Sequence, residues 1–130
     1  MNAPLTPTQH DSLQKTERQS HVVRALQVHL PTHALIWHDE DTTPYECDGL
    51  TAYRARPLVV ALPETEAQVA AVLKTCHQLG VPVVARGAGT GLSGGAMPHT
   101  MGVTMSLAKF NRILKIDPVS RTAVVQCGVR

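Results

Sequence analysis

The stretch Val81-Pro-Val-Val-Ala-Arg-Gly-Ala-Gly-Thr-Gly-Leu-Ser-Gly-Gly-Ala96 decides the fold of this chain. Its first five residues are apolar, which predicts a buried strand. The loop that follows holds five of the chain's nine glycines. Glycine lets the main chain adopt positive φ and approach a ligand closely, and successive amides can then form an anion-binding nest. The loop therefore predicts a diphosphate site, with hydroxyl donors from Thr90 and Ser93 and a positive charge from Arg86.

The residues before this loop predict a strand, a helix and a strand. Leu58–Leu62 is a short apolar run that fits a second buried strand. Thr65 and Gln68 form a capping-box pattern, and Gly80 suits the left-handed position after a helix. Because this βαβ unit spans about 30 residues, its two strands should be parallel.

The rest of the chain predicts an α+β fold. Val103–Leu107 is a further strand, and Ile113–Ile116 with Thr122–Val125 should form an antiparallel hairpin around a type I turn at Asp117-Pro-Val-Ser120. Apolar spacing predicts a helix over 17–30, and 38–52 lacks periodicity. We expect three parts: a flexible tail over 1–16, a helix with a polar connection over 17–52, and the main domain over 53–130.

Two familiar phosphate-binding schemes do not fit the glycine loop. A kinase-like loop ends in Gly-Lys-Ser/Thr, but no lysine occurs between Lys74 and Lys109. The GxGxxG fingerprint would place its third glycine at Leu92, and it needs a helix directly after the loop. Gly94, Gly95 and Pro98 disfavour that helix. A flexible linker is the remaining alternative, and the buried strands on both sides disfavour it.

The composition excludes several classes of protein. The chain has 130 residues, 43% of them hydrophobic and 17% charged, which suffices for one packed core. A net charge of +2 argues against a nucleic-acid binder, and no apolar run is long enough to span a membrane. The three cysteines fit neither a disulfide framework nor a metal site, so we expect free thiols, no metal and a cytoplasmic location.

Several segments resemble the vanillyl-alcohol oxidase / p-cresol methylhydroxylase family of FAD-linked oxidases. They are Pro57–Pro63, the Glu66–Cys76 helix and the run Pro82–Gly95 with its glycine loop. The segments Pro44–Arg54 and Phe110–Pro118 resemble the glycolate-oxidising branch of this family. The resemblance extends from about residue 20 to the end of the chain.

The resemblance implies a PCMH-type FAD-binding domain with two subdomains, of which this chain, expected to be a fragment of a longer protein, would supply the N-terminal part. Some relatives bond FAD covalently through a histidine where this chain has Thr90, so FAD should be non-covalent here. Cys127 stands where a proline often precedes Gly-Val, an exchange whose effect the resemblance leaves open. The residues implied in FAD binding are Arg86, Gly87, Ala88, Gly89, Thr90, Gly91, Leu92, Ser93, Gly94, Gly95, Ser106 and Leu107.

The implied activity is oxidation of a small 2-hydroxy acid, with glycolate converted to glyoxylate. D-lactate or 2-hydroxyglutarate is the alternative substrate, and a truncated chain without activity is another hypothesis. The family's substrate-binding and base residues lie beyond residue 130, so catalytic residues stay unassigned and the chain alone should be inactive. The resemblance also implies a second FAD-type subunit and an iron–sulfur subunit as partners, with attachment at the inner membrane as an alternative location.

Other polar residues have weaker claims to a role. His99 follows the glycine loop and is a candidate base, but a histidine in an exposed loop is the commoner case. Glu46 and Asp48 are a candidate carboxylate pair that we interpret as part of a solvated turn. Arg54 and Arg56 are candidate phosphate ligands that we interpret as surface residues.

Overall fold

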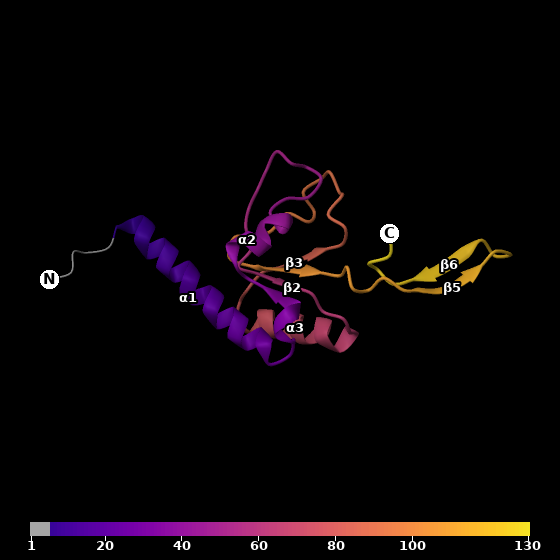
Figure 1. Ribbon diagram of the computed structural model, residues 1–130, viewed down its shortest axis with the longest axis horizontal. Coiled ribbons are helices and arrows are strands. Elements are labelled where there is room, and N and C mark those ends of the chain that lie inside the picture. The colour runs from indigo at the N-terminus through magenta and orange to yellow at the C-terminus, as the bar shows by residue number, and fades with distance from the viewer. Residues whose placement is uncertain (1–5) are drawn as a thin grey trace.

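The computed structural model describes residues 6–130, in which two helices cover one face of a four-stranded sheet and a two-stranded hairpin projects from its edge (Figure 1). The α-helices are α1 (Pro7–Gln27), α2 (Asp39–Thr42) and α3 (Glu66–Gln78), and the 3₁₀ turns are η1 (Thr32–Ala34) and η2 (Thr43–Tyr45). The strands are β1 (Leu35–Ile36), β2 (Val59–Ala61), β3 (Val83–Arg86), β4 (Val103–Ser106), β5 (Ile113–Asp117) and β6 (Thr122–Val125).

The main sheet has the strand order β1-β2-β4-β3. β1 is antiparallel to β2, whereas β4 pairs in parallel with both β2 and β3. The predicted βαβ unit is therefore confirmed in direction, since β2 and β3 run the same way. They are not hydrogen-bonded neighbours, because the crossover through α3 skips one position and β4 fills it. The α+β class is confirmed as well.

The core lies between the sheet and the helix pair α1 and α3. Both faces of β2 and β4 are covered. The paired residues Val59 and Val103 face the helices, and the next pair, Val60 and Thr104, is fully buried on the opposite face of the sheet. The prediction of a doubly buried strand at 58–62 is confirmed. The apolar strand predicted at 81–85 is confirmed as β3, but its expected burial is wrong, because β3 is the edge strand and its residues are half-buried or exposed.

Helix α1 begins ten residues earlier than the expected start at residue 17. Thr6 caps it in a reciprocal box, in which the Gln9 amide donates to Thr6 Oγ1 and the Thr6 amide donates to Gln9 Oε1 at 2.8 Å. The expected tail is thus helical over 7–16, while residues 1–5 lie outside the described residues. This first part of α1 is exposed, so it carries no apolar periodicity that could have predicted it.

The segment 38–52 was expected to be irregular, and this is wrong for 39–45. It contains α2 and η2, and the segment lies on the sheet face opposite α1 and α3 (Figure 1). Thr42 and Asp48 are buried there. These elements are too short to show a hydrophobic period, which explains the error.

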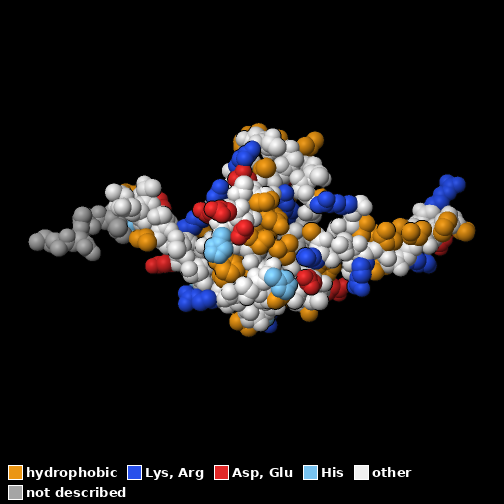
Figure 2. All heavy atoms as spheres, in the orientation of Figure 1, with side chains coloured by type: hydrophobic (Ala, Val, Ile, Leu, Met, Phe, Trp, Pro, Cys, Tyr) orange, Lys and Arg blue, Asp and Glu red, His pale blue; other side chains and the backbone are white. Residues whose placement is uncertain are grey.

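The predicted hairpin of β5 and β6 is confirmed. Asp117 Oδ1 accepts a hydrogen bond from the Ser120 amide at 2.9 Å, which closes the turn. Apolar side chains are exposed along it, including Ile116 at 65% and Val119 at 94%, and Figure 2 shows them along the projecting arm. No helix within residues 6–130 is long and apolar enough to cross a membrane.

Replacing Leu26 with Ala should lower the free energy of unfolding by about 2–5 kcal/mol, because this core side chain is 0% exposed and leaves a cavity. Urea denaturation followed by circular dichroism measures the change. The matched control is Leu13→Ala on the same helix, where the side chain is 48% exposed and the change should stay within about 0.5 kcal/mol. Equal losses in the two variants would contradict the packing of α1 described above.

Candidate functional site

The candidate site lies where β3 and β4 end. The two strands are parallel, and Arg86 of β3 is paired with Ser106 of β4. The Leu107 amide donates to the Arg86 carbonyl at 2.9 Å. The glycine loop after β3 is therefore adjacent to Ser106 and Leu107, two predicted site residues that are distant in sequence. The carboxyl edge of parallel strands is also where open sheets of this kind bind ligands.

The main-chain amides of the glycine loop are free. None of the N–H groups from Gly87 to Ala96 donates a hydrogen bond to another residue within 6–130. Most of the loop is exposed, and Leu92 reaches 72%. Because a main-chain N–H is an obligatory donor, these groups bind either water or a ligand. No helix follows the loop, as the sequence predicted, so the donors belong to the loop itself.

The loop glycines fall into two kinds. Gly89 and Gly94 have φ of 73° and 76°, which the fold requires to be glycine. Gly87, Gly91 and Gly95 have no such φ, and a Cβ added there would meet nothing within 4 Å. The fold itself therefore does not require glycine at these open positions, which leave the main chain accessible to a ligand. The loop thus fits a diphosphate, whose oxygens need close contact with the main chain.

A cleft of about 410 Å³ adjoins the start of the loop. The sequence analysis did not predict that residues within 108–113 and 128–130 line this cleft. Gly128 was the one sequence feature that could have indicated a close contact there. The Gly128 amide donates to the Phe110 carbonyl at 2.7 Å, and a Cβ at this position would overlap the Leu107 carbonyl. The residues lining the cleft are Gly87, Ala88, Ala108, Asn111, Ile113, Gly128, Val129 and Arg130.

Asp48 was interpreted as part of a solvated turn, and this is wrong. Its side chain is 3% exposed, with Oδ1 accepting from the Leu50 amide at 2.9 Å and Oδ2 buried without a partner in the described residues. Glu46 does not pair with it but with Arg54, at 2.6 Å, and Arg56, at 3.8 Å. The side chains of Arg54 and Arg56 are 63% and 42% exposed, as expected for surface residues.

His99 lies at the wrong edge of the sheet for a base at the glycine loop. It precedes β4, so it is at the amino end of a strand whose carboxyl end adjoins the loop. The ring is exposed, and Nδ1 accepts a hydrogen bond from the Met101 amide at 3.1 Å. Its interpretation as an exposed loop histidine is confirmed.

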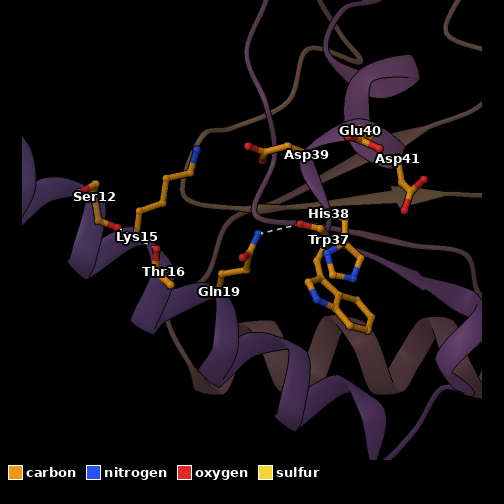
Figure 3. A pocket seen from close by; sticks show the side chains of 9 residues that line it. All are labelled: Ser12, Lys15, Thr16, Gln19, Trp37, His38, Asp39, Glu40 and Asp41. Carbon is orange, nitrogen blue, oxygen red and sulfur yellow. Dashed lines mark hydrogen bonds between the residues drawn. The ribbon is translucent and has the colours of Figure 1, made fainter.

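A hollow of about 810 Å³ lies between α1 and residues 37–41 (Figure 3). Gln19 closes its floor by donating to the Trp37 carbonyl at 3.0 Å. The surrounding side chains are of mixed charge, with Lys15 directed toward the acidic residues of α2. Because none of its lining residues belongs to the glycine loop or to Ser106 and Leu107, volume alone does not locate the predicted site.

Among the residues that the structure describes, two ionisable groups have shifted pKa values. Burial raises the pKa of the Cys76 thiol to about 11, and the hydrogen bond from the Ser120 main chain lowers the pKa of Asp117. Cys47 is partly exposed, Cys127 is exposed, and all three cysteines are free. Within residues 6–130, no three His, Cys, Asp or Glu side chains gather as a metal site would require.

The edge site, with its free amides and open glycine positions, has the features of a dinucleotide-binding domain. Residues 57–130 match the family model described as an FAD binding domain, and the chain belongs to this family. FAD is therefore the cofactor of the domain class, as predicted. The comparisons do not indicate covalent attachment of FAD.

Particular relatives narrow the comparison. The chain is 57% identical over 109 residues to glycolate oxidase subunit GlcD of Escherichia coli (strain K12), an overlap of 84% of this chain and 22% of that protein. It is 34% identical over 107 residues to D-2-hydroxyglutarate dehydrogenase of Xanthomonas citri pv. viticola, covering 82% and 23%. The structure of p-cresol methylhydroxylase matches with a TM-score of 0.73 and 26% identity, covering 87% and 23%. The predicted family resemblance is confirmed, and this chain spans less than a quarter of each of these three relatives.

Iodoacetamide at about pH 8.5 should alkylate Cys127 rapidly and leave Cys76 unmodified, because the thiolate is the reactive form. Burial keeps Cys76 protonated at this pH, and unfolding in urea returns its pKa to the ordinary value of 9.0 and exposes it. Because the pKa is higher in the folded state, the Cys76 thiol contributes to the free energy of unfolding below pH 9.0. This contribution is lost as the pH rises from 9.0 through about 11. Peptide mass spectrometry reads the pattern, and rapid labelling of Cys76 in the folded chain would contradict its burial.

Gly89→Ala should destabilise the chain by about 1–3 kcal/mol, because its φ of 73° is unfavourable for alanine and the new Cβ would overlap the Arg86 guanidinium. Gly91→Ala should leave stability unchanged or raise it by up to about 1 kcal/mol. Urea denaturation of the two variants tests the distinction. A large loss in Gly91→Ala would show that the fold itself requires this glycine.

Proposed function

We propose that this chain is the FAD-binding part of an FAD-dependent 2-hydroxy-acid dehydrogenase whose substrate is glycolate and whose product is glyoxylate. One observation carries the cofactor assignment: a loop of free, exposed amides at a parallel strand edge, in a chain that belongs to an FAD-binding family. The substrate assignment is supported by the relative named glycolate oxidase subunit.

The glycine loop would hold the diphosphate of FAD. The amides from Gly87 to Gly95 supply the donors, the hydroxyls of Thr90 and Ser93 add two more, and the open glycines leave room for the phosphate oxygens. Ser106 and Leu107 lie beside the loop and would contact the flavin side of the cofactor. The FAD would be held non-covalently.

When bound, FAD supplies the redox chemistry by accepting a hydride equivalent from a 2-hydroxy acid. The chain's own contribution is to fix the cofactor by main-chain dipoles, which are set by the backbone and need no reorganisation. Such fixation determines which way the reactive ring faces. A base for the hydroxyl proton and a cation for the substrate carboxylate are assigned to no residue of this chain.

A second candidate is oxidation of D-2-hydroxyglutarate or D-lactate, which relatives named D-2-hydroxyglutarate dehydrogenase and D-lactate dehydrogenase favour. Turnover of the three acids by the protein that contains this domain would separate the candidates. The relative named as a subunit supports a multi-subunit enzyme, with a second FAD-type subunit and an iron–sulfur subunit as proposed partners. The cytoplasmic location, the inner-membrane alternative and the domain limits at 17–52 and 53–130 stay predictions.

The purified chain should quench FAD fluorescence with a dissociation constant in the micromolar range. Gly91→Ala should weaken binding by at least about tenfold, because its methyl group occupies the space of the diphosphate while the fold is unaffected. The matched control is Gly80→Ala. Gly80 has φ of 61° and lies at the end of α3, so its variant should lose stability but keep its FAD affinity.

Absence of quenching by the wild-type chain would favour the hypothesis of a chain without cofactor. If wild-type and Gly91→Ala chains bind FAD equally well, the diphosphate does not lie on this loop.

A further inference from the structure

The segment Pro44–Leu50 packs against the glycine loop, although the family match begins only at residue 57. We call this segment the platform. Arg86, the residue that begins the loop, donates from Nη1 to the Cys47 carbonyl at 2.7 Å and from Nη2 to the Pro44 carbonyl at 3.5 Å. Its guanidinium carbon also lies 5.6 Å from the centroid of the Tyr45 ring, within cation–π range. One side chain therefore contacts three platform residues.

The platform also meets the loop through its own main chain. A Cβ at Gly49 would lie 2.8 Å from the carbonyl oxygens of both Thr90 and Gly91, so only glycine allows this approach. A Cβ at Gly89 would overlap the Arg86 guanidinium, which places that group directly against the loop. The guanidinium is thus enclosed between loop and platform.

The platform keeps its own shape through local contacts that do not involve Arg86. Asp48 Oδ1 accepts from the Leu50 amide at 2.9 Å and is buried, and Glu46 is paired with Arg54. Within the described residues, Arg86 makes no ion pair with Glu46 or Asp48. Its donors are directed to main-chain carbonyls, so its role is to join two segments.

We propose that the platform is part of the dinucleotide site and that Arg86 is a positioning residue, which fixes the glycine loop against the platform instead of binding the phosphates. The loop amides can act together on one anion only while the loop keeps its shape, and the contacts of Arg86 and Gly49 hold that shape. The proposal rests on the proposed function, in which this loop holds FAD.

Lysine distinguishes the two roles of Arg86. A phosphate contact needs a positive charge, which lysine supplies as a point charge. Bridging two carbonyls and stacking on Tyr45 needs the planar fork of arginine, which lysine lacks. Arg86→Lys therefore retains affinity if the side chain binds phosphate and loses it if the side chain positions the loop.

The experiment compares Arg86→Lys, Arg86→Met and Gly49→Ala with the wild-type chain in FAD fluorescence titrations. We expect all three to bind at least about tenfold more weakly. The matched control is Arg24→Met, which also removes an arginine hydrogen-bonded to a main-chain carbonyl, that of Ser20 in α1. Its affinity should stay within about twofold of wild type.

A second measurement needs no FAD. In a Cys127→Ser background, alkylation of the partly exposed Cys47 should be at least about fivefold faster in Arg86→Lys than in wild type, because the platform is released. The Arg24→Met variant should label at the wild-type rate. The alkylation rate still tests the role of Arg86 if the Gly49→Ala variant does not fold.

Wild-type affinity in Arg86→Lys together with loss in Arg86→Met would make Arg86 a phosphate-binding cation and overturn the proposal. Wild-type affinity in both Arg86→Lys and Gly49→Ala would remove the platform from the site. If the wild-type chain itself does not bind FAD, the proposed function is wrong. If the wild-type chain binds FAD and the variants bind equally well, only the inference about Arg86 and the platform is wrong.

Discussion

The whole arrangement depends on main-chain amides that stay unpaired at the end of a strand. β3 and β4 are parallel, so both chains leave the sheet at one edge, and the loop after β3 continues there without entering a helix. Its N–H groups find no acceptor within the described protein. An exposed row of donors is an unsatisfied requirement that water or an anion must meet. A diphosphate meets it with several oxygens at once, which links this feature of the backbone to the chemistry of FAD.

The rest of the fold packs behind this edge. The sheet is covered on one face by α1 and α3, and Val59 and Val103 are completely buried beneath them. On α1, Gln19 donates to the carbonyls of Trp37 and Leu58 and so ties the helix to the end of β1 and the start of β2. The other face is covered by the segment that contains α2 and the platform. The loop is therefore supported by packing beneath it and by Arg86 beside it.

Local signals in the sequence predicted local structure well. The capping pattern at Thr65 correctly predicted α3, and the turn residues at Asp117 correctly predicted the hairpin. The density of glycines correctly predicted a loop with free amides. Errors arose where the signal is absent or weak. The exposed first part of α1 has no apolar stripe, and the capping box at Thr6 was its one indication. Asp48 was misjudged because its sequence neighbours are polar, although distant residues bury it.

Sequence patterns alone were enough to predict most of the helices and strands, a glycine loop with free amides and the family resemblance, because torsion preferences, caps and glycine spacing act between residues close in the chain. Only the tertiary structure decided that β4 lies between β2 and β3 and that Gly49 lies against the loop. It also decided where Arg86 points, toward a carbonyl 39 residues away. Such contacts depend on how whole elements pack, and no local pattern of residue types encodes them.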